Sequence, residues 1–219
     1  MSAKVAVILS GCGFLDGAEI HEAVMTLFAL QKLGAKTICF APNIDQTDVI
    51  NHLTRELVPN ERRNVLVESA RIARGNITDL AEFDPTQVDA MVLPGGFGAT
   101  KNLSSFASEG ADCSINPDVE AAIKGMIRLN KPVAALCISP AVVTRLYDNP
   151  TLTIGQDADT AHALETMGAN HETTGHGEVV VDRENKLVTT PCYMLDATVP
   201  DIAHGAENAM EVLLTLIDD

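Results

Sequence analysis

The chain of 219 residues contains no tryptophan, and aromatic residues make up only 4% of it. A hydrophobic core must therefore be built from Val, Ile, Leu, Ala and Met. Positive charge is also scarce, because 15 Lys and Arg stand against 30 Asp and Glu, which gives a net charge of −15. Nucleic acids and anionic membranes require clustered basic residues, so we expect neither as a partner.

Cysteines are few and show no pairing pattern: the chain has five, an odd number, and no CxxC motif. The sequence therefore predicts neither a disulfide framework nor a zinc knuckle, and we expect no metal. Free thiols are typical of a reducing compartment. The first apolar stretch is too short for a signal peptide, and no apolar run approaches the ~18 residues of a membrane span. We therefore expect a cytoplasmic protein.

Short apolar runs alternate with stretches of helical periodicity along the chain. The runs expected as strands are 5–9, 35–41, 88–93, 132–136, 152–154, 179–181 and 187–190. The stretches expected as helices are 20–33, 65–73, 119–129, 140–147, 161–167 and 202–217. Apolar strands that alternate with helices form a mainly parallel sheet covered on both faces. The sequence thus predicts one α/β domain over residues 1–219, with a hairpin added near its end and a polar excursion at 43–63.

The first helix carries an apolar stripe and several carboxylates. The stripe is expected at i, i+4, i+7 and i+8, on Ile20, Val24, Leu27 and Phe28. Asp16 followed three residues later by Glu19 has the form of an N-terminal cap. Glu22 has no role in this pattern. It either faces the edge of the sheet or, as the simpler interpretation, lies in solvent.

A strand at 132–136 runs directly into Cys137 and then into a helix that begins at Pro140. Serine hydrolases hold their nucleophile on such a tight strand-to-helix turn, and the small residues Ala135 and Ser139 fit it. The N–H groups of a helix start lower the pKa of a thiol from ~8.5 to ~3.5–7.5. A buried core thiol is the alternative, but the sequence favours a nucleophile.

Two glycine-rich loops are expected at the same edge of the sheet, where the carboxyl ends of parallel strands meet. The loop at 94–99 exposes N–H groups that can hold an oxyanion. Asn102, which follows it, either caps the next helix or touches a ligand. The loop at 11–17 has GxGxxxG spacing without an acidic partner for a ribose, so we expect no NAD. Its Cys12 is either a second functional thiol or a packing residue.

Several motifs together resemble one family. They are Leu-Ser-Gly-Cys-Gly at 9–13, Asp-Gly-Ala-Glu-Ile-His-Glu-Ala-Val at 16–24, Asp-Val-Ile-Asn-His-Leu-Thr at 48–54, Gly-Gly-Phe-Gly-Ala-Thr-Lys-Asn-Leu at 95–103, Ala-Ala-Leu-Cys-Ile-Ser-Pro at 134–140 and Val-Thr-Thr-Pro-Cys-Tyr-Met-Leu at 188–195. The combination spans essentially the whole chain and is similar to the ElbB group (isoprenoid-biosynthesis glyoxalases) of the ThiJ/PfpI superfamily. The resemblance implies a flavodoxin-like three-layer α/β/α sandwich, related to class I glutamine amidotransferases, and commonly a homodimer.

The resemblance also implies a site. Superfamily members pair the elbow cysteine, here Cys137, with a glutamate of the first helix, which by its distance from Gly34 is Glu22. Backbone groups of Gly95, Gly96 and Ile138 would hold the substrate oxygen, with Asn102 as a further candidate contact.

Two departures from the superfamily pattern limit the possible chemistry. Ile138 stands where protease-like members have a histidine, which removes the Cys–His pair that protonates an amine leaving group. His176-Gly177-Glu178 has the His-x-Glu form of the amidotransferases but precedes the hairpin. An amidase or amidotransferase interpretation therefore depends on whether His176 reaches Cys137.

The resemblance implies a glutathione-independent glyoxalase, an enzyme of the lyase type, and the residues fit this chemistry. Cys137 would add to the aldehyde of glyoxal or methylglyoxal, and Glu22 would move a proton through an enediol. Hydrolysis would then release glycolate or lactate, without metal, glutathione or another cofactor. A redox-responsive protective or regulatory protein is the alternative, because an exposed, acidic thiol also forms a sulfenate.

Overall fold

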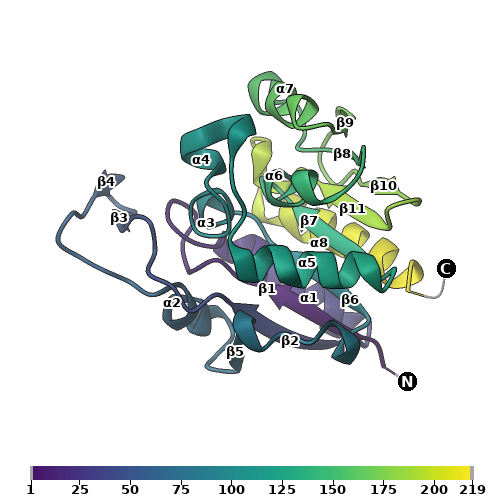
Figure 1. Cartoon of the computed structure of the whole chain (residues 1–219), viewed down its shortest axis with the longest axis horizontal. Coiled ribbons are helices and arrows are strands. Elements are labelled where there is room, and N and C mark those ends of the chain that lie inside the picture. The colour runs from purple at the N-terminus through teal and green to yellow at the C-terminus, as the bar shows by residue number, and fades with distance from the viewer. Residues whose placement is uncertain (1, 218–219) are drawn as a thin grey trace.

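A seven-stranded sheet forms the centre of the computed structural model, which describes residues 2–217. The strand order is β10-β11-β7-β6-β1-β2-β5, and all neighbours are parallel except the β10–β11 pair (Figure 1). The strands are β1 (Lys4–Ile8), β2 (Lys36–Ala41), β5 (Ile77–Asp79), β6 (Ala90–Leu93), β7 (Val133–Leu136), β10 (Val180–Asp182) and β11 (Leu187–Thr190). The predicted α/β class, with a mainly parallel sheet and an added hairpin, is confirmed.

The inner strands β1, β6 and β7 consist of aliphatic residues that are buried on both faces of the sheet. Every residue of β6 and β7 is buried, and in β1 only Lys4 is exposed. A strand that is covered on both faces has no polar side, so it appears in the sequence as a continuous apolar run. This is why the sequence pattern identified these strands.

Helices cover both faces of the sheet. They are α1 (Ile20–Lys32), α2 (Val65–Ile72), α3 (Phe97–Lys101), α4 (Phe106–Glu109), α5 (Pro117–Arg128), α6 (Pro140–Val143), α7 (Ala158–Thr166) and α8 (Val199–Thr215). In Figure 1, α5 crosses in front of the sheet, while α1 and α8 pack together behind it. Helix α8 begins with a capping box between Thr198 and Asp201, which fixes its first turn.

The buried face of α1 differs from the predicted one. Ile20, Val24 and Phe28 are 42%, 42% and 58% exposed. The buried stripe is instead formed by Glu22, Ala23, Thr26, Ala29 and Leu30. Small side chains are needed on this face because α1 packs closely against α8 and β2. Hydrophobicity alone therefore selected the wrong side of the helix, and Glu22 lies on the side that faces the protein interior.

The N-terminal cap of α1 is also different. Glu19 is the N-cap residue, and its carboxylate accepts the N–H of Glu22 at 2.7 Å. The predicted cap, Asp16, instead accepts the N–H of Ile50 at 2.7 Å. Asp16 therefore anchors a distant segment to the loop after β1, and the capping role falls to the carboxylate one turn before Glu22.

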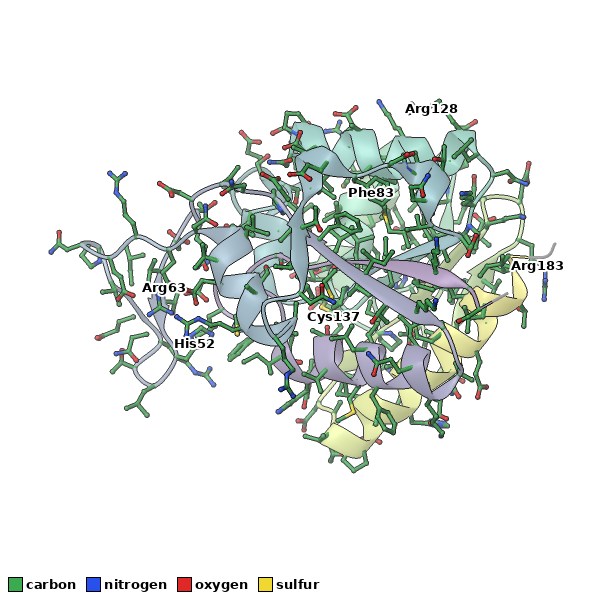
Figure 2. The ribbon with its side chains drawn as sticks, turned by 90° about the horizontal axis from the view of Figure 1, so that it is seen from below. His52, Arg63, Phe83, Arg128, Cys137 and Arg183 are labelled. Carbon is green, nitrogen blue, oxygen red and sulfur yellow. The ribbon has the colours of Figure 1, made fainter. Side chains whose placement is uncertain are left out.

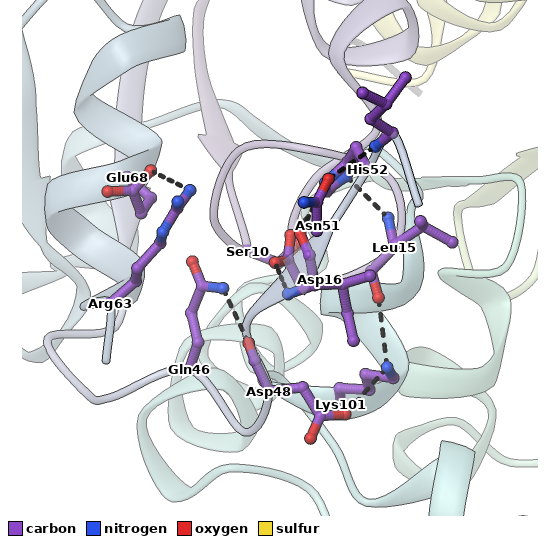
Figure 3. A network of polar contacts seen from close by, with 12 residues as sticks. Ser10, Leu15, Asp16, Gln46, Asp48, Asn51, His52, Arg63, Glu68 and Lys101 are labelled. Carbon is purple, nitrogen blue, oxygen red and sulfur yellow. Dashed lines mark hydrogen bonds and ion pairs between the residues drawn. The ribbon is translucent and has the colours of Figure 1, made fainter. Parts of the chain in front are cut away.

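Residues 43–63 form the expected polar excursion. It carries the short hairpin of β3 (Ile50–Asn51) and β4 (Glu56–Leu57) and projects away from the sheet (Figure 1). Figure 3 shows polar contacts at its base, where His52 accepts the N–H of Leu15 at 3.3 Å. These contacts join the excursion to the loop after β1, at the carboxyl edge of the sheet.

Three smaller expectations need correction. The predicted helix at 140–147 ends as α6 at Val143 and continues as a 3₁₀ turn, Thr144–Leu146. The run at 152–154 forms β8 (Thr151–Leu152), which pairs with β9 (Asn170–His171) outside the main sheet. The edge strand β5 was not predicted, because its three residues are too few to show a period. Across residues 2–217, no helix combines the length and the apolar character needed to cross a membrane.

Candidate active site

Cys137 lies on a sharp turn at the carboxyl end of β7. Its φ of 58° is in the left-handed region, which non-glycine residues adopt only where the surrounding structure enforces it. Two hydrogen bonds do so here: the N–H of Cys137 donates to the carbonyl of Thr190 at 2.9 Å, and the hydroxyl of Ser139 donates to the carbonyl of Pro94 at 2.8 Å. The turn has the geometry that was predicted for a nucleophile elbow.

Glu22, in the first turn of α1, places its carboxyl group against this cysteine. One oxygen, Oε2, accepts the N–H of Gly95 at 2.9 Å, and Oε1 accepts the N–H of Tyr193 at 3.2 Å. The carboxyl group also shares a hydrogen bond with the thiol of Cys137. The side chain of Glu22 is completely buried. The structure thus brings together the two residues that were predicted as catalytic.

Gly95 makes this contact possible because it has no side chain. A Cβ atom at this position would lie 2.4 Å from Cβ of Cys137 and 2.6 Å from Oε2 of Glu22. Any larger residue would therefore occupy the space in which the thiol and the carboxyl group meet. The sequence predicted Gly95 as a contact to the substrate oxygen, but its N–H is already used to hold Glu22.

Burial raises the pKa of both Glu22 and Cys137. Desolvation, strengthened by the nearby charge of Glu19, raises the pKa of Glu22 to about 8. Desolvation and the adjacent Glu22 carboxyl raise the pKa of Cys137 well above its ordinary value. The sequence predicted the opposite direction for the cysteine. Helix α6 has only four residues, so its dipole is weak, and the lowering effect of a helix start is outweighed by the carboxyl group and by burial.

Two backbone N–H groups, those of Gly96 and Ile138, donate to the sulfur of Cys137 and partly offset these effects. Gly96 has a φ of 96°, and a Cβ atom there would lie 2.4 Å from the backbone of Glu19 and of Gly17. The chain can therefore turn its N–H toward the sulfur only with glycine at this position. The two donors predicted for an oxyanion site thus lie beside the reactive atom.

A pocket of about 620 Å³ opens above the sulfur. It is lined by Phe14, Glu19, His21, Gly96, Phe97, Cys137, Ile138, Asp157, Thr160, Tyr193 and Met194. Cys137 itself is only 7% exposed, so it forms the floor of the pocket. Figure 2 shows Cys137 near the centre of the molecule, far from His52 and Arg63 on the excursion. The sulfur is therefore buried but borders a space that a small molecule can enter.

Asn102 does not join this site. Its side-chain nitrogen donates to the carbonyl groups of Ser10 and Asp16, both at 2.9 Å, and its oxygen accepts the N–H of Thr47 at 2.9 Å. The residue is buried and does not line the pocket. It joins three loops at the edge of the sheet, so a direct contact with substrate is not supported.

Cys12 and His176 also lie apart from Cys137. Cys12 is electrostatically coupled to Glu68 and Arg71, and burial raises the pKa of its thiol. His176 lies near Asp201 at the start of α8, and the pKa of that carboxylate is lowered chiefly by hydrogen bonds from Thr198. Neither residue lines the pocket. The geometry therefore gives no support to a resolving thiol at Cys12 or to a Cys–His pair with His176.

Tyr193 and His21 are two of the pocket residues that were not predicted from the sequence. The phenol oxygen of Tyr193 and Nδ1 of His21 lie 2.8 Å apart, and the backbone N–H of Tyr193 holds Glu22. Tyr193 comes from the 3₁₀ turn after β11, which lies beside β7 in the sheet. Pro191-Cys192-Tyr193 follows a strand end and belongs to the family motif at 188–195, but neither signal gives the strand order that brings Tyr193 to the site.

Fold and site together define a flavodoxin-like α/β protein of the class I glutamine amidotransferase-like type, with a cysteine on its elbow. No protein-family model matches the chain. The human protein named glutamine amidotransferase-like class 1 domain-containing protein 3, mitochondrial, is 42% identical over 224 residues, which cover 98% of this chain and 84% of that protein. The chain belongs to this family of glutamine amidotransferase-like class 1 domain-containing proteins.

Two solved structures extend the comparison. The crystal structure of an isoprenoid biosynthesis protein with amidotransferase-like domain from Ehrlichia chaffeensis is 35% identical, with a TM-score of 0.90, and covers 97% of this chain and 99% of that one. Glyoxalase III from Candida albicans has the same fold at 16% identity, with a TM-score of 0.62 and coverage of 98% and 97%. The flavodoxin-like fold of the amidotransferase-like type, which the motifs implied, is thereby confirmed.

Proposed function

We propose that this protein is a cofactor-independent glyoxalase that converts small 2-oxoaldehydes into 2-hydroxy acids. The observation that carries the proposal is the hydrogen-bonded contact between Cys137, at the floor of an accessible pocket, and the buried carboxyl group of Glu22 behind it. A thiol, a carboxyl group of high pKa and two N–H donors beside the sulfur are what the reaction requires. The fold shared with a glyoxalase is consistent with it.

The first step joins the sulfur of Cys137 to the aldehyde carbon. The thiol proton passes to the carboxylate of Glu22 and from there to the new hemithioacetal oxygen. The N–H groups of Gly96 and Ile138, which lie beside the sulfur, stabilise negative charge on that oxygen. The raised pKa of the thiol makes this proton transfer necessary, because little free thiolate is present at neutral pH.

Glu22 then completes an internal oxidation and reduction. Its carboxylate removes the proton from the former aldehyde carbon, which forms an enediolate. The hydroxyl proton of that carbon passes to the oxygen of the neighbouring carbon, and Glu22 returns its proton to the neighbouring carbon itself. The first carbon is oxidised to a thioester and the second is reduced to an alcohol, so no external electron acceptor is needed. Water cleaves the thioester and releases the 2-hydroxy acid and the free thiol. The pKa of about 8 suits a group that both accepts and donates a proton.

The direct test is turnover of glyoxal and methylglyoxal by the purified protein without glutathione, with glycolate and lactate measured by chromatography. Cys137→Ala should reduce product formation to background. Cys12→Ala, which changes a thiol outside the pocket, should retain activity. Equal turnover by the wild-type protein and Cys137→Ala would overturn the proposal.

A redox-responsive role is the second candidate. It is favoured by the two N–H donors that face the sulfur, because they would also stabilise a sulfenate. It is disfavoured by the raised pKa of Cys137, since the thiolate is the form that reacts with peroxide. Intact-mass spectra after mild peroxide treatment separate the two roles: a stable single-oxygen adduct on Cys137 together with no 2-oxoaldehyde turnover would support the redox role.

The proposal has four further parts. We propose that the protein belongs to the ElbB group, that it is associated with isoprenoid output, that it forms a homodimer and that it is cytoplasmic. The neighbour from Ehrlichia chaffeensis carries the isoprenoid name, and the human relative is named mitochondrial. Analytical ultracentrifugation tests the homodimer, with a sedimentation coefficient of a 23.3 kDa monomer as the contrary result.

A further inference from the structure

The pocket above Cys137 is shaped for a molecule larger than glyoxal and without negative charge. We propose that the site takes uncharged carbonyl compounds in which the reacting carbon carries an aromatic or branched aliphatic group, directly or through a neighbouring carbonyl group, and that it rejects anionic ones. Phe97 and Ile138 are the residues that determine this specificity. The inference rests on the proposed function, because it names the substrate class of the same nucleophile.

The size of the pocket is the first argument. A volume of about 620 Å³ is in the range of ~300–1,000 Å³ that holds ligands of drug size. Glyoxal and methylglyoxal would leave most of this space to water. A substrate that fills the pocket would remove more apolar surface from water, and it would be held with its carbonyl group against the sulfur.

The chemistry of the walls is the second argument. Phe14, Phe97, Ile138 and Met194 line the pocket from four different segments of the chain, and Phe14 and Phe97 remain 39% and 46% exposed. Exposed aromatic side chains around a concave site are typical of a surface that binds an apolar group. The N–H of Phe97 donates to the carbonyl of Phe14 at 2.7 Å, which fixes the two aromatic residues relative to one another.

The third argument is charge. Apart from Cys137, the ionisable side chains that line the pocket are Glu19, Asp157, His21 and Tyr193, and none of the described lining residues is Lys or Arg. A hydrogen bond from Thr160 holds the pKa of Asp157 below its ordinary value, so this carboxylate is charged at neutral pH. A carboxylate or phosphate group on the substrate would meet negative charge without a cationic partner.

The position of the donors identifies the specificity residues. The N–H groups that face the sulfur belong to Gly96 and Ile138, and the side chains of Phe97 and Ile138 follow directly from this backbone. A carbonyl oxygen held by these two N–H groups leaves the substituent of the same carbon next to Phe97 and Ile138. Apolar side chains at these two positions therefore select an apolar substituent.

Alkylation of Cys137 tests the pocket without requiring turnover. Three reagents of matched reactivity are used: 2-iodo-N-phenylacetamide (neutral, aromatic), iodoacetamide (neutral, small) and iodoacetate (anionic, small). Their rates are measured from the mass of the peptide that contains Cys137 and are divided by the rates with free cysteine, which removes intrinsic reactivity. We expect the aromatic reagent to exceed iodoacetamide by tenfold or more, and iodoacetate to fall below iodoacetamide by threefold or more.

Two variants test which residue causes the preference for the aromatic reagent. Phe97→Ala should reduce the aromatic preference at least threefold, whereas Leu129→Ala should leave it unchanged, because Leu129 is a similarly exposed residue that does not line the pocket. Relative rates equal to those with free cysteine, or a preference for iodoacetate, would overturn the inference. A preference that survives Phe97→Ala unchanged would overturn the assignment of Phe97.

Turnover separates this inference from the proposed function. An aromatic 2-oxoaldehyde should have a kcat/KM at least tenfold above that of glyoxal. If glyoxal is converted but the aromatic compound is not preferred, the substrate class is wrong and the glyoxalase proposal stands. If the alkylation preference is present and no 2-oxoaldehyde is converted, the glyoxalase proposal is wrong and the assigned ligand class stands.

Discussion

Glu22 and Cys137 are 115 positions apart in the sequence, yet the carboxyl group of one and the thiol of the other share a hydrogen bond inside the protein. Two backbone N–H groups hold the carboxyl group in place, one from Gly95 and one from Tyr193. A buried carboxyl group with three hydrogen-bond partners has one orientation available to it. The catalytic proposal and most of the predictions below follow from this relationship.

The pH dependence of activity should follow the ionisation of the Glu22 carboxyl group. Glu22 accepts the thiol proton only when it is ionised, and its pKa is raised to about 8. We therefore expect kcat/KM to rise with pH through this region and to level off above it, with a fall of up to tenfold per pH unit on the acidic side. Glu22→Gln should lower kcat by ~10²–10⁴-fold and remove the inflection near pH 8. Steady-state rates from pH 5 to 9 provide the measurement.

Stability should also depend on pH through Glu22. Its pKa in the folded protein, about 8, lies above the value of 4.5 for a free side chain. The folded state therefore binds more protons than the unfolded state between these values, and the free energy of unfolding falls as pH rises, by at most ~1.4 kcal/mol per unit. Urea unfolding at several pH values should show this slope. The slope should be flatter in Glu22→Gln, and an unchanged slope would contradict the assignment to Glu22.

Gly95→Ala should damage the site in a specific way. Its Cβ atom would lie 2.4 Å from Cβ of Cys137. We expect destabilisation of roughly 1–3 kcal/mol from overpacking, together with loss of 2-oxoaldehyde turnover. Gly205→Ala in α8 is the matched control, because its Cβ atom would find its nearest neighbour at 3.4 Å. That change should leave activity intact and stabilise the helix by about 0.5–1 kcal/mol. Thermal unfolding and turnover are compared for both variants.

Asn102→Ala should lower the stability of the protein without changing the selectivity of the pocket. Loss of three hydrogen bonds, two of them buried, leaves the carbonyl groups of Ser10 and Asp16 and the N–H of Thr47 without these partners. We expect the free energy of unfolding to fall by about 2–4 kcal/mol and the excursion at 43–63 to exchange its amide hydrogens faster. The selectivity of Cys137 among the three alkylating reagents should persist. Asn60→Ala, at an exposed position of the same excursion, is the control. A loss of selectivity in Asn102→Ala without destabilisation would restore a ligand role for this residue.

Local features of the sequence were sufficient to predict Cys137 as a site residue, but they were not sufficient to predict Glu22. The elbow is encoded within a few residues: a buried strand, small neighbours and Pro140. The burial of Glu22 depends on how α1 rotates against α8 and β2, and the most hydrophobic side chains of α1, such as Phe28, face outward instead. Only the resemblance to a family indicated Glu22 before the structure did.

The direction of the Cys137 pKa was wrong for a related reason. The sequence shows that a helix starts after the elbow, but it does not show how short that helix is or that a carboxyl group lies against the sulfur. Tyr193 was missed because its segment reaches the site through the order of β11 and β7 in the sheet. Contacts between distant segments follow from topology, and a single sequence contains little information about them.

The two oxygens of the Glu22 carboxyl group are bound by two separate segments, at Gly95 and at Tyr193, and of these two residues Tyr193 also lines the pocket. A molecule that pushes Tyr193 outward weakens an N–H contact that favours the ionised form, so Glu22 would hold its proton more tightly. A molecule that presses Tyr193 toward Glu22 would favour release of that proton. Occupancy of the pocket and acidity of its base are therefore linked, and the infrared carbonyl band of protonated Glu22 should change in intensity when the pocket is filled.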